Sequence, residues 1–238
     1  NRVQSICVAY EGMEKFFPAD KIVMTGNPIR SIIVPATPEM KEEGVKEYGL
    51  DPLRKHIFIV GGSLGSARFN QCMKKWISDG CPGIDGVDVL WQCGKHYKPD
   101  IDKFMDGQRA KNPDVVRHIH HSDFIGRMDL AYAAADVVVS RSGASSVSEL
   151  CAARKAVIFI PSPNVAEDHQ THNAMALVRK DAAVLVKDSD AMEKMIPTAL
   201  ELLGNPARIA TLEENAGKMA LPDAAEKIAE EVYKLVKD

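Results

Sequence analysis

The sequence of 238 residues has few of the features that mark membrane-spanning, nucleic-acid-binding or disulfide-rich proteins. Its apolar runs all fall short of the roughly 20 residues that cross a bilayer. Its formal net charge of −3 gives no reason to expect a nucleic-acid partner. Its five cysteines form no CxxC pair, and such an odd, scattered set is typical of free thiols in a reducing compartment. It also lacks an initial Met, because it begins at Asn1, which fits a processed product or a piece of a longer protein.

What the sequence does contain is a regular alternation of apolar strands and amphipathic helices. Strands are expected at 56–60, 87–92, 115–120, 137–139, 156–160 and 183–186, with helices between them and three more helices at the end. This alternation predicts right-handed βαβ units. The expected fold is therefore α/β, with a doubly wound, parallel, six-stranded Rossmann-like sheet.

Residues 1–35 follow a different pattern. Short strands are expected at 5–9 and 21–24, and Gly26-Asn27-Pro28 then breaks the structure. A piece shorter than about 40 residues rarely buries a core of its own. We therefore expect residues 1–35 to be the end of another α/β domain with a linker, and residues 36–238 to form one large domain.

The stretch from Ser140 to Glu149 follows a buried strand and continues as a helix. Gly143 is expected to allow a sharp turn and close approach of a ligand, and Ser145 or Ser146 to cap the helix. The first amides of that helix then lie at the carboxyl end of the sheet, where open α/β proteins bind ligands. Glu149 suits two hydroxyls of a ribose, or it only stabilises the helix dipole.

A glycine-rich turn, Gly61-Gly62-Ser63-Leu64-Gly65-Ser66, follows the first strand of the large sheet. Its amides can approach a phosphate, although it lacks the lysine of a P-loop and the spacing of a dinucleotide site. The pattern Gly-x-Ser63-x-Gly also matches the nucleophile elbow of α/β-hydrolases, with Asp168 and either His169 or His172 following in the required order. A serine hydrolase that uses Ser63 is therefore an alternative, although no upstream loop completes an oxyanion hole.

Three further polar segments have two interpretations each. His118 and His120 share one face of a strand, but no carboxylate or cysteine cluster accompanies them, so a solvated strand end is favoured over a metal site. The loop 123–126 could read a base edge through its backbone, or simply pack into the core. The cluster 167–173 is rich in amides and imidazoles that suit sugar hydroxyls, and Asp168 could also cap the helix that follows.

Together these stretches resemble the MurG family, the UDP-N-acetylglucosamine transferases that make the lipid-linked peptidoglycan precursor. The matching motifs run nearly end to end and in the family's order, at 26–30, 61–70, 91–95, 124–128, 141–149, 168–174 and 221–225. The resemblance implies a GT-B glycosyltransferase with two Rossmann-like domains. This chain would hold the C-terminal, donor-binding domain and a remnant of the N-terminal, acceptor-binding domain.

The resemblance also implies roles for single residues. The UDP pyrophosphate would meet Ser63 and the amides of Gly62 and Leu64, and Arg30 would lie near the nucleotide. The backbone of Ile125 would read uracil with Met128 nearby, and Glu149 would hold the ribose. N-acetylglucosamine would meet the Ala144 amide, His169 and Gln170, although the family often has glutamine where His169 stands.

The implied reaction is inverting transfer of N-acetylglucosamine from UDP to lipid-linked N-acetylmuramyl-pentapeptide, at the cytoplasmic face of the cell membrane. Backbone amides and a helix terminus can stabilise the departing diphosphate, so no metal or other cofactor is expected. The resemblance places the base and the acceptor site in the N-terminal domain. No catalytic residue is therefore expected in this chain, which by itself should bind the donor but transfer no sugar. A related UDP-sugar transferase or a sugar-nucleotide epimerase is a further alternative.

Overall fold

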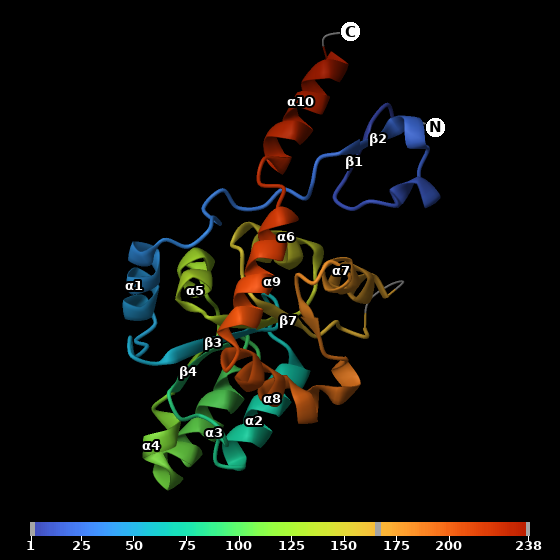
Figure 1. The fold of residues 1–238 in the computed structure, drawn as a ribbon. Coiled ribbons are helices and arrows are strands. Elements are labelled where there is room, and N and C mark those ends of the chain that lie inside the picture. Colours follow the sequence, from blue (N-terminus) through green and yellow to red (C-terminus); the bar gives the residue numbers. More distant parts are fainter. Residues whose placement is uncertain (1–2, 165–167, 237–238) are drawn as a thin grey trace.

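The computed structural model describes residues 3–164 and 168–236. Its main feature is a six-stranded sheet in the order β5-β4-β3-β6-β7-β8, with every neighbouring pair parallel. Figure 1 shows three of its strands, β3, β4 and β7, among the surrounding helices. The strands are β3 (Lys55–Val60), β4 (Val87–Gln92), β5 (Ile119–Ser122), β6 (Val137–Ser140), β7 (Val157–Phe159) and β8 (Val184–Leu185). The strand order reverses between β3 and β6, so the predicted doubly wound α/β fold is confirmed.

Helices cover both faces of this sheet. One face packs against α2 (Ala67–Ser78), α3 (Lys98–Lys111) and α8 (Ala191–Leu203), and the other against α5 (Met128–Ala134), α6 (Ala144–Ala152) and α7 (His169–Val178). Successive residues of β3 divide between the two cores: Ile57 and Ile59 join the first, whereas Phe58 and Val60 join the second. Two-sided burial explains why the strands are continuous apolar runs in the sequence.

The remaining helices lie at the margins. Helix α1 (Pro38–Glu47) packs on α5, and Gly44 permits the close approach, because a Cβ there would lie 2.4 Å from the Leu130 carbonyl oxygen. Helix α9 (Pro206–Lys218) contributes Leu212 to one core and Ala216 to the other. Helix α10 (Ala224–Val236) ends the described chain. None of the helices in the described ranges is long and apolar enough to span a bilayer.

The strand expected at 115–120 begins later than predicted. Residues 113–116 form a short helix, α4 (Pro113–Val116), and β5 begins only at Ile119. Pro113 occupies the first helical turn, where its fixed φ is favourable and its missing N–H costs nothing. The apolar pair Val115-Val116 therefore packs from a helical turn instead of opening the strand.

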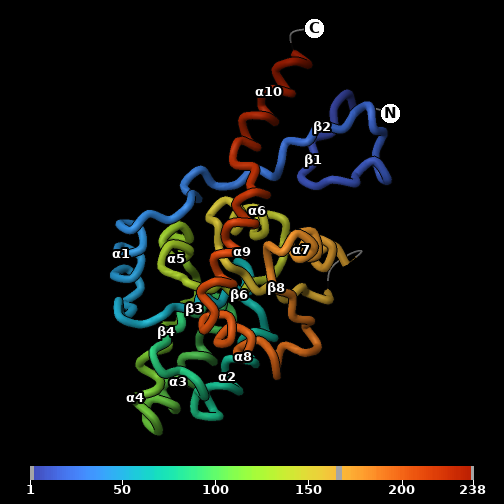
Figure 2. Tube along the Cα trace, in the orientation of Figure 1, coloured from blue at the N-terminus to red at the C-terminus, as the bar shows by residue number. Residues whose placement is uncertain are grey.

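The first residues form a separate, two-stranded sheet. Strand β1 (Ile6–Val8) pairs in parallel with β2 (Ile22–Met24), as the two expected strands require. The chain then crosses the large sheet's helices as a linker, and α10 extends away from them beside the small sheet (Figure 2). The Ser5 hydroxyl donates to Glu231 of α10 at 3.3 Å. The boundary between residues 35 and 36 stays a prediction.

The linker also contacts the segment that leads into α10. Gly26 has φ +90°, and a Cβ on it would lie 2.7 Å from the Leu221 Cβ. Beyond this contact, Ala224 is buried, whereas Val232, Leu235 and Val236 are exposed. Most of the apolar side of α10 is therefore uncovered in the described chain.

Candidate functional site

The candidate site lies where the strand order reverses, at the carboxyl ends of β3 and β6. A cavity of about 240 Å³ opens there. Six residues predicted to bind the donor line it: Arg30, Gly62, Ser63, Ile125, Met128 and Glu149. The fold thus brings together side chains from four separate segments of the sequence.

A second cavity of about 670 Å³ adjoins the first and shares Gly62 and Ser146 with it. Its walls include Arg68, Arg141 and Gln170, the last of which was predicted to meet the sugar. The other three predicted residues line neither cavity. Ala144 and His169 are the first residues of α6 and α7, and the Leu64 side chain is 81% exposed.

Arg30 and Glu149 form a bidentate ion pair inside the first cavity. Arg30 Nε donates to Glu149 Oε1 and Nη2 to Oε2, both at 2.9 Å. The Glu149 side chain is 10% exposed, and the Arg30 side chain is 44% exposed. The hydrogen bond from Arg30 to Glu149 raises the pKa of the guanidinium, which stays charged. The carboxylate predicted to hold a ribose is therefore held in place by Arg30.

Tyr132 completes the surroundings of this carboxylate. Its hydroxyl donates to Glu149 Oε2 at 3.4 Å, and burial raises the pKa of that hydroxyl above its usual range, so it stays protonated. Glu149 is the sixth residue of α6, past the first turn, where the helix dipole has lost most of its effect. A role limited to the helix dipole therefore does not explain the position of Glu149.

The start of α6 differs from the prediction in two details. The N-cap is Gly143, and both candidate caps, Ser145 and Ser146, lie inside the helix without a side-chain capping bond. Gly143 has φ −62° and ψ 149°, so the turn does not need a left-handed residue. No atom lies within 4 Å of where its Cβ would be, so the backbone at the start of α6 is open to a ligand.

The glycine-rich turn after β3 does need its glycines. Gly62 has φ +90° and open space around its missing side chain. A Cβ on Gly65 would lie 2.2 Å from the Cys93 carbonyl oxygen, and one on Gly94 would lie 2.2 Å from the Leu64 carbonyl oxygen. The β3–α2 and β4–α3 loops therefore touch backbone to backbone.

Ser63 does not occupy a nucleophile elbow. Helix α2 begins four residues later, at Ala67, after the N-cap Ser66, whose Oγ accepts from the Phe69 N–H at 3.3 Å. A nucleophile elbow places the serine on a strained turn directly between strand and helix. Ser63 is also not among the described residues other than glycine that have a positive φ. The hydrolase alternative therefore has no support in the geometry.

Gln92, the last residue of β4, is a site residue that the sequence analysis missed. Its side chain is buried, and its Nε2 donates to the Gly62 carbonyl at 2.8 Å. Its Oε1 accepts from the Ile125 N–H at 3.0 Å. A glutamine that ends a strand whose one other polar residue is Asp88 is the signal that could have identified it.

Arg141 was also missed as an organising residue. Its guanidinium donates to Asp188 Oδ1 at 2.7 Å, to Ser66 Oγ at 3.0 Å and to the carbonyls of Ile160 and Pro161. These bonds join the ends of β6 and β7 to the start of α2. Arg141 therefore fixes the wall of the larger cavity.

The polar cluster before α7 is only partly described, because Glu167 lies outside the described residues. Asp168 stands at the N-cap but makes no backbone capping bond, so this expectation is wrong; its carboxylate accepts from the Thr171 hydroxyl at 2.7 Å. Gln170 Oε1 accepts from the Ser162 N–H at 2.9 Å. The Gln170 carbonyl accepts from the Ser142 hydroxyl at 2.8 Å, which ties α7 to the start of α6.

Comparison with known proteins identifies the family. Residues 56–228 match the model of the glycosyltransferase family 28 C-terminal domain. The chain belongs to glycosyltransferase family 28. The match takes in the six strands of the large sheet except Lys55, the first residue of β3, and every residue that lines the two cavities except Arg30.

Two curated relatives extend the family 28 match along the chain. Both are named UDP-N-acetylglucosamine--N-acetylmuramyl-(pentapeptide) pyrophosphoryl-undecaprenol N-acetylglucosamine transferase. The protein from Parabacteroides distasonis is 47% identical over 99% of this chain and 61% of its own length. The protein from Bacteroides fragilis is 47% identical over 98% of this chain and 60% of its own length. The chain thus spans about three fifths of the curated relatives it matches.

A solved structure supports the family 28 fold. The crystal structure of Acinetobacter baumannii MurG matches with a TM-score of 0.68 and 24% identity, over 97% of this chain and 60% of that chain. The expected fold, the C-terminal domain of a GT-B glycosyltransferase, is therefore confirmed.

The family 28 domain also holds a buried charge cluster at the amino end of β4, away from both cavities. His118 Nδ1 lies 2.9 Å from Asp88 Oδ1, His120 Nε2 lies 3.6 Å from Asp88 Oδ2, and Arg54 Nε lies 2.7 Å from Oδ1. A carboxylate therefore does accompany the two histidines, and the expectation of a solvated strand end is wrong. Burial by itself raises the pKa of the Asp88 carboxyl, but hydrogen bonds from His120, the Asp51 N–H and His118 bring it down to about 2. The described residues contain no group of His, Cys, Asp and Glu that could hold a metal ion.

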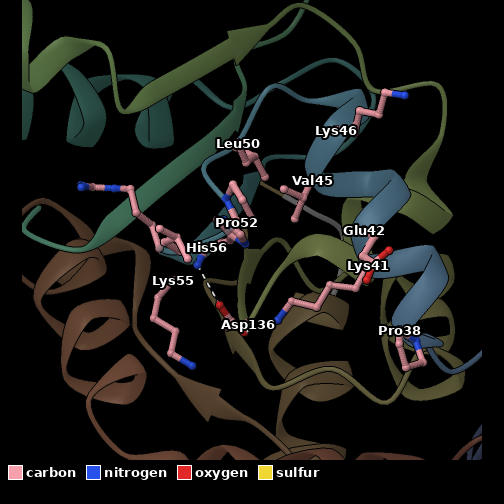
Figure 3. Close-up of a pocket in the computed structure, with 12 residues that line it drawn as sticks. Pro38, Lys41, Glu42, Val45, Lys46, Leu50, Pro52, Lys55, His56 and Asp136 are labelled. Atoms are coloured by element: carbon pink, nitrogen blue, oxygen red, sulfur yellow. Dashed lines mark hydrogen bonds and ion pairs between the residues drawn. The ribbon is translucent and has the colours of Figure 1, made fainter.

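A further cavity of about 710 Å³ lies between α1 and the amino ends of β3 and β6 (Figure 3). Val45 and Leu50 form part of its wall, and Lys41 donates to Asp136 at 2.9 Å beside it. None of the residues predicted to bind the donor lines this cavity. It is on the opposite edge of the sheet from the candidate site.

Proposed function

We propose that this chain is the donor-binding part of an inverting transferase that moves N-acetylglucosamine from UDP-N-acetylglucosamine to lipid-linked N-acetylmuramyl-pentapeptide, which converts lipid I to lipid II in peptidoglycan synthesis. The observation that carries the proposal is the convergence of Arg30, Ser63, Ile125 and Glu149 on one cavity at the reversal point of a family 28 sheet. The names of the curated relatives, which give both donor and acceptor, support the same reaction.

The two adjoining cavities suggest how the donor lies. Uracil is proposed to meet the Ile125 backbone beside Met128, and the ribose hydroxyls to meet Glu149. The diphosphate would cross at Gly62, where both cavities meet, close to Ser63 and the first amides of α6. The sugar would then occupy the larger cavity beside Gln170.

Three further residues are proposed to contact the donor because each is next in sequence to a residue that lines the larger cavity: Leu64, Ala144 and His169. The Ala144 amide is at the start of α6 and His169 at the start of α7, so both can face a sugar in the larger cavity. Leu64 contributes through its backbone, because its side chain is exposed and lines neither cavity.

The chemistry follows from the leaving group. The acceptor 4-hydroxyl attacks the anomeric carbon, the bond from that carbon to the β-phosphate oxygen breaks, and its electron pair stays on UDP. Attack from the face opposite UDP converts the α-linked donor into a β-glycoside. Amides of the Gly62 turn and of the α6 start are proposed to stabilise the departing diphosphate. The proton of the acceptor hydroxyl would pass to a base outside this chain.

The identity of the acceptor and the place where it binds are proposed from the names and lengths of the curated relatives alone. Their names specify an undecaprenol pyrophosphate acceptor, which resides in a membrane, and the chain spans only three fifths of their length. The acceptor site would lie in the part of the relatives that this chain does not match. The whole enzyme would then work at the cytoplasmic face of the membrane.

The experiment is a binding titration with the purified chain. UDP and UDP-N-acetylglucosamine should bind and raise the thermal midpoint, ADP and GDP should not, and no sugar should reach a lipid-linked acceptor. A fluorophosphonate probe serves as the control for the hydrolase alternative, and it should leave Ser63 unlabelled. Failure of both uridine ligands to bind would refute the donor site, and turnover by this chain alone would refute the placement of the base.

A further inference from the structure

Gln92 joins two loops of the candidate site. It ends β4, which lies between β5 and β3 in the sheet, and is only 3% exposed. It lines the smaller cavity with Ile125 and Gly62. Its two side-chain hydrogen bonds run to loops that lie 30 and 33 residues away in the sequence.

The first bond determines what the Ile125 backbone can offer a ligand. Gln92 Oε1 accepts from the Ile125 N–H at 3.0 Å, so that donor is already used. No described residue donates to the Ile125 carbonyl. A base that meets Ile125 therefore meets a hydrogen-bond acceptor.

The second bond fixes the turn that faces the diphosphate. The Gly62 carbonyl accepts from Gln92 Nε2 at 2.8 Å and from the Gly65 N–H at 2.9 Å. Because a trans peptide holds its carbonyl and the following N–H in opposite directions, the Ser63 N–H must point away from Gln92. The same side chain thus sets the direction of a donor in the phosphate turn.

We infer that Gln92 is a positioning residue that makes the base subsite select uracil over cytosine. Uracil carries N3–H, which can donate to the Ile125 carbonyl. Cytosine carries a lone pair at the same ring position, so two acceptors would face each other. A site built around a hydrogen bond rejects the analogue that cannot make it. This inference rests on the proposed uridine site.

The test uses the ratio of UDP to CDP affinity, measured by calorimetry. Both ligands carry the same diphosphate, so changes in charge or in the phosphate turn cancel in the ratio. The chain should bind UDP at least about tenfold more tightly than CDP. Gln92→Met, similar in length but without either bond, releases the Ile125 N–H, and the ratio should fall to within about threefold of one.

Gln92→Glu separates the two bonds. Its carboxylate still accepts from the Ile125 N–H but cannot donate to the Gly62 carbonyl. UDP and CDP should both weaken, and their ratio should stay within about twofold of that of the unaltered chain. Gln108→Met, on the far helix α3, is the matched control and should change neither affinity.

The possible outcomes separate a failure of the proposed donor site from a failure of the role inferred for Gln92. If the unaltered chain binds neither nucleotide, the donor site itself is wrong. If it binds UDP and CDP equally, or if Gln92→Met folds and keeps the full ratio, the role of Gln92 is wrong while the donor site stands. If Gln92→Met does not fold, the ratio in Gln92→Glu decides, and its collapse would overturn the inference.

Discussion

Replacing Glu149 with alanine should weaken UDP binding and leave the fold intact. The carboxylate is buried at the edge of the smaller cavity, and its two oxygens already accept from Arg30, with Tyr132 as a third donor. A carboxylate has about four acceptor positions. Ribose hydroxyls must therefore share these oxygens with Arg30 or displace it.

The expected magnitude follows from these contacts. A hydrogen bond to a charged group contributes about 1.5 kcal/mol at the lower end of its range, so two ribose hydroxyls contribute about 3 kcal/mol. Loosening Arg30 costs up to about 1 kcal/mol, because its side chain is 44% exposed and water can replace its partner. The net value of about 2 kcal/mol corresponds to a loss of UDP affinity of one to two powers of ten.

Calorimetry with two ligands tests this reasoning. UDP should bind Glu149→Ala about 30-fold more weakly, whereas the 2′,3′-dideoxy analogue should bind the variant and the unaltered chain about equally. The thermal midpoint should change little, because Arg30 can turn to solvent. An equal loss for both ligands would show that Glu149 does not hold the ribose.

Three more outcomes are expected. Arg30→Ala should tighten uridine binding, because Glu149 no longer has to leave an ion pair, and weaken UDP binding, because the dianionic ligand loses the attraction of a nearby positive charge. A change in the same direction for both ligands would contradict this reasoning. The Asp88 carboxyl has a pKa of about 2 in the folded protein, below its usual value near 3.8, so it contributes about 2 kcal/mol to the free energy of unfolding above pH 4. This contribution is lost as the pH falls toward 2, and urea unfolding of Asp88→Asn should lack this part of the acid destabilisation. Gly94→Ala places a Cβ against the Leu64 carbonyl and should lower the thermal midpoint of unfolding, whereas the control Gly107→Ala, in open space on α3, should raise it slightly. Equal midpoints for the two variants would refute the backbone contact between the β3–α2 and β4–α3 loops.

The elements that the sequence predicts best have strong local signals. Strand β4 is a mostly apolar run, interrupted by Asp88 and ended by Gln92, and it was predicted with its observed bounds, 87–92. The segment 113–118 has too few residues to distinguish one helical turn from a strand. Pairing of β5 with β4 begins only at Ile119, so the residues of α4 are not held in the sheet and form a helical turn.

Most residues predicted for the candidate site do line one of its two cavities, whereas Gln92 and the contacts between the side chains were not predicted. The glycine-rich turn and the β6–α6 stretch have local patterns that indicate a phosphate site, and family resemblance added Arg30 and Ile125. The ion pair between Arg30 and Glu149 joins residues 119 positions apart, and no periodicity encodes such a distance. The burial of Asp88 between His118 and His120 depends in the same way on the pairing of β4 with β5.

The contact between Gly26 and Leu221 has a mechanical consequence. The chain leaves the large sheet's helices twice, once through the linker after β2 and once before α10, and these two crossings touch at Gly26. The small sheet has further contacts with the large domain, because Glu11 pairs with Lys180 at 3.9 Å and Tyr10 shares a small cavity with Cys151 and Leu177. Its position is therefore set at several points at once. Arg30 lies four residues along the linker from Gly26, so any shift of the small sheet would act on the residue that pairs with Glu149.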